Sequence, residues 1–185
     1  MHMATQTKQW TLEELHSLPD DGNKYELVRG ELFVTPPPND EHETIISRLT
    51  RILDPFVAAN SLGLVYHARA VMRFEGSEVE PDLMVRQMKT PGSRDWDDAP
   101  TPSLIIEVIS PSTRRREHEH KRQLYLDAGV PEYWIVDPER QSIRIIRPAS
   151  ADEVSSDQLT WSPPGANESL LVDVRAVFGD HASDS

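Results

Sequence analysis

The sequence contains no cysteine, and none of its apolar runs is long enough to cross a membrane. Without cysteine, the chain can form neither disulfide bonds nor thiolate metal sites. The N-terminal residues also lack the basic-then-apolar pattern of a secretory leader. We therefore expect a cytoplasmic protein that does not contact a membrane.

Basic residues are also few, because 19 Lys and Arg stand against 31 Asp and Glu, which gives a net charge of -12. A surface built for tight, nonspecific binding of duplex nucleic acid is usually basic. A nucleic-acid function must therefore rest on a local basic patch, or on metal ions that change the sign of the charge in a site.

The 185 residues suit a single domain, and a hydrophobic content of 37% is enough to form a core. Thr11–Glu14 has the pattern of a capping box that opens a short helix ending before Pro19. Alternation of apolar and polar residues around Arg29-Gly30 predicts a β-hairpin over Tyr25–Thr35. Asn39 or Asp40 is a suitable cap for a helix that runs to about Asn60 with one apolar stripe.

The remaining elements follow from apolar runs and from the turn residues between them. Ser103–Ile109 is apolar without alternation, as expected of a strand buried on both faces. A helix is predicted from Pro111–Thr113 to about Ala128-Gly129. Further strands are predicted at 64–74, 82–85, 132–136 and 141–147, a flexible loop at 149–164, and a strand with a helical turn at 170–178. This order predicts an α/β or α+β fold with a mixed sheet flanked by helices.

Two carboxylates lie in or next to apolar strands. Glu107 stands in the middle of the most apolar strand, and Asp82 begins a short one after Pro81. A buried carboxylate is costly unless it is paired or binds a cation. Taken singly, each acid is better explained by an ion pair or a cap than by catalysis.

Taken together, Asp82 and Glu107 suggest a different explanation, since their two strands follow one another along the chain. If the strands are neighbours, the two carboxylates converge, and we expect them within roughly 6 Å of each other, close enough to share one hydrated ion. Hard divalent cations such as magnesium prefer such oxygen ligands. The ion can polarise a phosphoryl group and lower the pKa of bound water.

Four segments carry a resemblance to a known family: "YELVRGELFVTPPPNDEH", "EPDLMVRQ", "SLIIEVISPST" and "HKRQLYLDAGVPEYWIVDP". In this combination and order they resemble the Uma-two family, which belongs to the PD-(D/E)xK nuclease superfamily. The similarity covers about Tyr25 to Pro148. It implies a restriction-endonuclease-like core at about 25–148 within a single domain of residues 1–185, with a C-terminal extension at 149–185.

The resemblance also implies roles for individual residues. Pro81-Asp82 corresponds to the PD element and Glu107 to the acid of the (D/E)xK element, so both would bind Mg²⁺ or Mn²⁺. The superfamily often has lysine where this chain has Ile109. The family places that lysine on the following helix, where Lys121 is the match. The alternative for Lys121 is a surface ion pair with Glu117, four residues before it.

Three more polar residues match the family pattern as possible auxiliary site residues: His42, Glu26 and Glu31. For His42, a metal-site role and a simple helix N-terminal role are about equally expected. Glu26 and Glu31 are as readily explained as solvated or ion-paired hairpin residues.

The helix after Glu107 is rich in charge, and Arg114–Arg116 with Lys121 and Arg122 would form a local basic face. His118 and His120 are two residues apart, so they would point to different helix faces and would not share a zinc ion. Tyr133 and Trp134 are better explained by packing than by base stacking. Val130, Tyr133 and Trp134 suit the core and a dimer contact equally well.

Three hypotheses follow. The first is a magnesium-dependent endonuclease that hydrolyses phosphodiester bonds of DNA and works as a homodimer. The second is a catalytically inactive nucleic-acid-binding or regulatory module with the same fold. The third is a nuclease on RNA or on branched or single-stranded substrates. For the first, we also expect Asp82→Asn and Glu107→Gln to leave metal-free stability unchanged or higher, because two close carboxylates repel each other.

Overall fold

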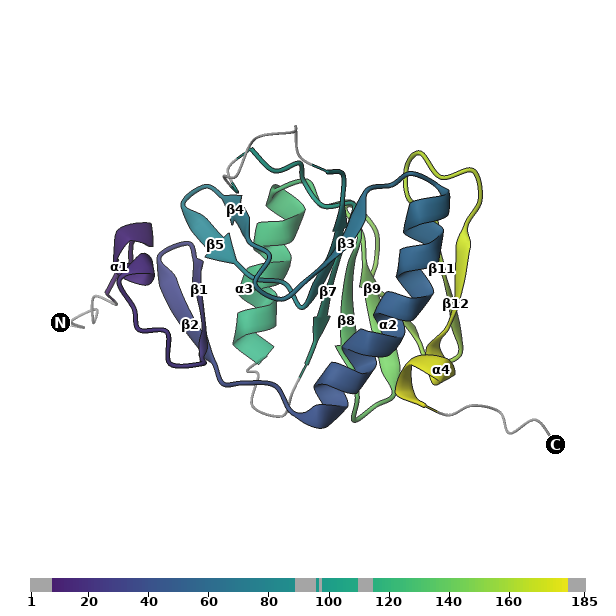
Figure 1. Ribbon diagram of the computed structural model, residues 1–185, viewed down its shortest axis with the longest axis horizontal. Coiled ribbons are helices and arrows are strands. Elements are labelled where there is room, and N and C mark those ends of the chain that lie inside the picture. Colours follow the sequence, from purple (N-terminus) through teal and green to yellow (C-terminus); the bar gives the residue numbers. More distant parts are fainter. Residues whose placement is uncertain (1–7, 89–95, 97, 110–114, 180–185) are drawn as a thin grey trace.

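The computed structural model describes residues 8–88, 96, 98–109 and 115–179, without the side chains of 115–117. A central six-stranded sheet has the order β10-β9-β8-β7-β6-β3 (Figure 1). Its strands are β3 (Leu64–His67), β6 (Leu83–Arg86), β7 (Leu104–Val108), β8 (Tyr133–Asp137), β9 (Ser142–Ile146) and β10 (Glu153–Ser155). The predicted mixed sheet flanked by helices is confirmed.

Parallel pairing occurs between β7 and β8, which are joined by a crossover through α3 (Arg115–Asp127), while the other pairs of this sheet are antiparallel. A parallel pair needs such a long connection, usually helical. All five residues of β7 are buried, as its unbroken apolar pattern predicts.

Two hydrophobic clusters cover the two faces of this sheet. On one face packs α2 (Asp40–Ala59), through Ile45, Leu49, Leu53 and Val57, with Trp134 of β8 in the same cluster. On the other face packs α3, through Leu124 and Tyr125 against Tyr133 and other strand residues. In Figure 1 the two helices lie on opposite sides of β7 and β8. The sheet is therefore the middle of three layers.

A second sheet of four strands, in the order β2-β1-β5-β4, stands beside α3 (Figure 1). Its strands are β1 (Lys24–Val28), β2 (Glu31–Thr35), β4 (Met72–Phe74) and β5 (Ser77–Val79). The predicted hairpin is β1 and β2. Its turn residues Arg29 and Gly30 both have positive φ, 50° and 82°, as a two-residue hairpin of right-handed twist requires.

The elements at the two ends of the molecule complete the fold (Figure 1). Near the N-terminus, α1 (Leu12–His16) begins at the predicted Thr11–Glu14 capping box. Near the C-terminus lie β11 (Gln158–Trp161), β12 (Leu170–Asp173) and α4 (Val174–Phe178). In the described part of the chain, no helix has both the length and the apolar composition of a membrane span.

Two predictions were wrong. The strand predicted at 64–74 is two strands, because β3 pairs with β6 in one sheet and β4 pairs with β5 in the other, with Arg69 at a φ of 75° between them. The loop predicted at 149–164 contains β10, which adds an edge to the central sheet, and β11, which pairs with β12. Long-range pairing overrode the small and polar local composition in both β10 and β11.

Two further predictions can be placed. The helix start predicted at Pro111–Thr113 lies outside the described residues, as does Arg114 of the basic face. Val130, Tyr133 and Trp134 are each exposed by 1% or less. They therefore belong to the core, as the packing interpretation predicted, and supply no dimer surface.

Candidate active site

Asp82 and Glu107 are brought together by the antiparallel pairing of β6 and β7. Leu83 is paired with Ile106, so the next position along this register sets Asp82 opposite Glu107. Opposed residues of an antiparallel pair point to the same face of the sheet. Both acids line one cavity of about 330 Å³. The arrangement agrees with the expected convergence, and the separation of roughly 6 Å stays a prediction.

Asp82 is held by three donors from three different elements. Its Oδ2 accepts a hydrogen bond from the Val108 backbone N–H at 2.9 Å and lies 3.1 Å from His42 Nε2. Its Oδ1 accepts from Lys24 Nζ at 3.2 Å. Burial alone would raise the pKa of Asp82, but Lys24, His42 and the Val108 N–H together hold it well below its usual range. Asp82 is therefore an anion at neutral pH.

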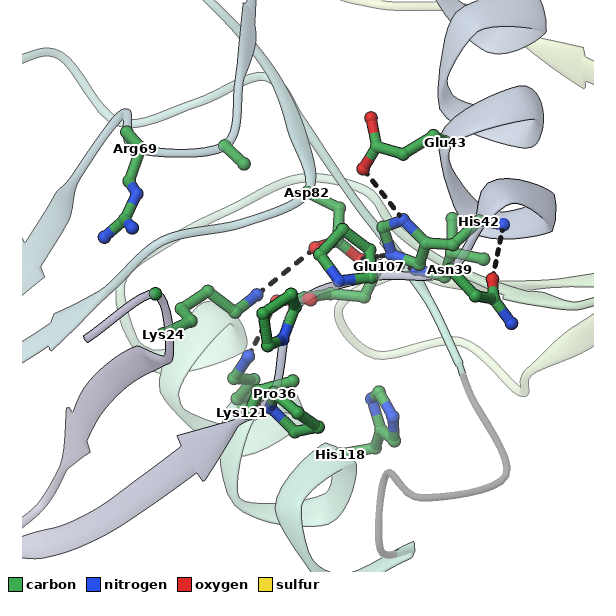
Figure 2. Close-up of a pocket in the computed structure, with 16 residues that line it drawn as sticks. Lys24, Pro36, Asn39, His42, Glu43, Arg69, Asp82, Glu107, His118 and Lys121 are labelled. Atoms are coloured by element: carbon green, nitrogen blue, oxygen red, sulfur yellow. Dashed lines mark hydrogen bonds and ion pairs between the residues drawn. The ribbon is translucent and has the colours of Figure 1, made fainter.

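Glu107 is in a different electrostatic situation. Its Oε1 accepts from Lys121 Nζ at 3.2 Å and from the Tyr125 hydroxyl at 2.7 Å. Burial raises the pKa of Glu107 to about 7, with the negative charge of Asp82 adding to burial and Lys121 opposing it. Figure 2 shows the two lysine contacts, from Lys24 to Asp82 and from Lys121 to Glu107.

Lys121 reaches the site from α3 and is fixed by a second acid. Its Nζ lies 2.7 Å from Glu26 Oε2, while the Glu80 backbone N–H donates to Glu26 Oε1 at 2.8 Å. Burial would raise the pKa of Glu26, but Lys121 and Lys24 lower it below its usual value. Because the Lys121 side chain is only 1% exposed, the surface alternative for this residue is wrong.

The predicted site residues therefore fall into three groups. Asp82, Glu107, Lys121 and His42 all line the cavity. Glu26 lies behind them as the partner of Lys121. Glu31 is not part of this group, because its Oε2 pairs with His120 Nδ1 at 3.1 Å and it does not line the cavity.

Three residues at the site were not identified from the sequence: Lys24, Tyr125 and His118. Lys24 is two residues from Glu26 on β1, so both side chains lie on the same face of the strand. His118 and Tyr125 lie three residues before and four residues after Lys121, which places all three on one face of α3. These spacings were visible in the sequence, but they become informative only once Lys121 is known to face inward.

His118 lines the cavity with only 9% of its surface exposed. Its Nδ1 lies 3.4 Å from the Tyr133 hydroxyl, and its Nε2 has no hydrogen-bond partner among the described residues. Burial lowers the pKa of His118 to about 4, with Lys121 adding to the effect, so the ring is neutral at pH 7. His120 instead contacts Glu31 and Phe33, in agreement with the prediction that the two histidines face different ways.

The donor set at the cavity fits a hard divalent cation. Asp82 and Glu107 supply carboxylate oxygens, and Mg²⁺ commonly takes one or two carboxylates while keeping several of its waters. Across the residues that the structure describes, no group of three or more His, Cys, Asp or Glu side chains is arranged to hold a metal ion. A bound ion would thus rely on these two acids and on water or substrate oxygens.

The raised pKa of Glu107 leads to a stability prediction. Its pKa when folded is about 7, above the ordinary glutamate value of 4.5 that it has in the unfolded chain, so its contribution to stability is complete below about pH 4.5 and is lost as pH rises through 7. In chelator, the wild type should lose roughly 2–3 kcal/mol of stability relative to Glu107→Gln between about pH 5 and pH 8. Urea unfolding of both proteins at the two pH values measures this difference. If the two proteins differ in unfolding free energy by the same amount at both pH values, Glu107 is ionised in the folded protein at both.

Comparisons with known proteins agree with this fold. A family model named Uma2, described as "putative restriction endonuclease", matches residues 12–174. A crystal structure from Anabaena variabilis, described as a putative nuclease belonging to DUF820, is similar with a TM-score of 0.76 and 23% identity, covering 91% of this chain and 97% of that one. No curated protein matches the sequence. With only 23% sequence identity, this structural likeness establishes the fold alone, which is the restriction-endonuclease-like fold.

Proposed function

Because the chain belongs to the Uma2 family, we propose that it is a metal-dependent endonuclease that hydrolyses phosphodiester bonds of DNA. One observation carries the proposal: Asp82 and Glu107 line a single cavity into which Lys121 also projects. Two carboxylates and a lysine are the groups that phosphodiester hydrolysis needs to bind a cation and to stabilise developing charge.

Each residue has a distinct role in this proposal. Asp82 and Glu107 would hold Mg²⁺ or Mn²⁺, which would supply Lewis acidity and a bound water of lowered pKa. Lys121 would stabilise the charge that develops on the phosphate oxygens. His42 and the Val108 N–H orient Asp82, and the Tyr125 hydroxyl orients Glu107.

DNA is proposed as the substrate because the matched family is described as restriction endonucleases, which cut DNA. A homodimer is proposed as the working form because a duplex has two strands to cut. Phosphodiester chemistry alone does not distinguish DNA from RNA, or duplex from branched or single-stranded forms. Cleavage of matched DNA and RNA oligonucleotides measures substrate preference, and sedimentation equilibrium measures the oligomeric state.

Removal of metal provides the direct test of this function. With Mg²⁺ or Mn²⁺ the protein should nick or linearise supercoiled plasmid, cleavage should fall to background in EDTA, and excess Mg²⁺ should restore it. Metal should also raise the melting temperature, because a ligand at 100 times its Kd stabilises the folded state by about 2.7 kcal/mol. Cleavage that persists in EDTA would contradict metal dependence.

A second candidate is a nucleic-acid-binding module that does not cleave. The observation that favours it is that Lys24 and Lys121 already neutralise much of the carboxylate cluster. Such a module would retard DNA in a gel without cutting it at any metal concentration. The same protein preparation can be used for both assays.

A further inference from the structure

Lys24 contacts the candidate metal ligand Asp82 directly. It lies at the start of β1, and its Nζ is 3.2 Å from Asp82 Oδ1, 3.1 Å from the Glu80 carbonyl oxygen and 3.8 Å from Glu26 Oε2. It also lines the cavity. No part of the family resemblance assigns it a role.

The contacts of Asp82 show where a cation must approach. Oδ2 is engaged by the Val108 N–H and by His42, which orient the carboxylate. Oδ1 is the oxygen that receives Lys24. A divalent ion that binds Asp82 through Oδ1 therefore meets the Lys24 ammonium at the same oxygen. Two cations that close repel each other strongly in a partly buried site.

The two lysines of the cluster differ in their freedom to move. Lys121 is 1% exposed and is held between Glu26 and Glu107. The side chain of Lys24 is 17% exposed, and a lysine stem is long and flexible. Lys24 can therefore leave Asp82 more easily than Lys121 can leave its two acids. Once displaced, its amine remains next to the cavity.

We propose that Lys24 occupies, in the metal-free protein, the position against Asp82 Oδ1 that a divalent cation takes, so that Lys24 and the cation compete for this carboxylate. The proposal rests on the proposed metal-dependent function. Before metal binds, the Lys24 ammonium neutralises the charge of Asp82. When metal displaces Lys24, the ammonium remains beside the cavity, where it can bind a substrate phosphate.

The test is Mn²⁺ binding by calorimetry at neutral pH without nucleic acid, so that no turnover is needed. Lys24→Met, which keeps the stem and removes the charge, should bind Mn²⁺ about tenfold more tightly than the wild type. Lys24→Gln should do the same, and Lys24→Arg, which keeps a cation, should not. Lys8→Met is the matched control, because Lys8 is an exposed lysine paired with Glu14.

The possible outcomes are separable. If folded Lys24→Met and Lys24→Gln bind Mn²⁺ no more tightly than the wild type, Lys24 does not compete with the cation. If Asp82→Asn abolishes Mn²⁺ binding in the same series, the metal site at Asp82 is nevertheless supported. Binding in Lys24→Met where the wild type shows none would support the competition in its strongest form. If no protein in the series binds Mn²⁺, both the competition and the metal-dependent function are wrong.

Discussion

Asp82→Asn is expected to reduce metal-dependent DNA cleavage by about 10²–10³-fold, the scale for losing one group that stabilises charge in a transition state. Asparagine keeps the size of the side chain but removes the negative charge that a divalent cation requires. Single-turnover cleavage of a plasmid at saturating protein measures the chemical step without product release.

The same substitution should also destabilise the metal-free protein. Asp82 pairs with Lys24 and accepts from Val108 and His42, so asparagine leaves a largely buried lysine with the more distant Glu26 carboxylate, 3.8 Å away, as its charge partner. Breaking such a buried pair costs about 3–5 kcal/mol. The sequence led us to expect that neutralising either acid would not lower metal-free stability. The structure revises this expectation for Asp82 and retains it for Glu107.

Asp157→Asn is the matched control, since it makes the same chemical change in an exposed side chain paired with Arg175. It should cleave and melt like the wild type. Glu107→Gln should be as inactive as Asp82→Asn while remaining stable. Cleavage by Asp82→Asn at the wild-type rate would remove this residue from the metal site.

The fold could be predicted from sequence wherever local pattern and long-range pairing agree. The stripe of α2, the Arg29-Gly30 turn and the buried run of β7 each carry their own periodicity. The break after His67 and the strand β10 depend on which sheet a segment joins. No local pattern encodes that choice, so tertiary pairing decides it.

The residues of the candidate site also divide into those that could be predicted from the sequence and those that could not. Asp82 and Glu107 stand out because a carboxylate in or beside an apolar strand needs an explanation, and adjacent strands bring them together. Lys24 and Tyr125 could not be predicted, since a lysine in a hairpin and a tyrosine in a helix are common. Only the structure shows that they contact Asp82 and Glu107. Glu31 matched the family pattern, yet its carboxylate pairs with His120 and does not line the cavity.

Lys121→Met is expected to lower metal-dependent cleavage by about 10²-fold or more, because the cavity loses the cation that would stabilise the phosphate. It should also lower stability by about 3–5 kcal/mol, since it leaves the fully buried Glu26 without its nearest charge partner. A surface lysine would cost only about 0–1 kcal/mol. The burial of Lys121 therefore predicts a much larger loss of stability than a surface ion pair with Glu117 would.

The double variant Lys121→Met with Glu26→Gln separates the two effects. Neutralising Glu26 removes the uncompensated charge, so much of the lost stability should return, as a double-mutant cycle measures by urea unfolding. Cleavage should not return, because the cation at the cavity is still missing. If cleavage recovers together with stability, Lys121 acts only by holding the hairpin against α3. The charge on the phosphate must then be stabilised by another residue, for which Lys24 and Arg69, which also line the cavity, are candidates.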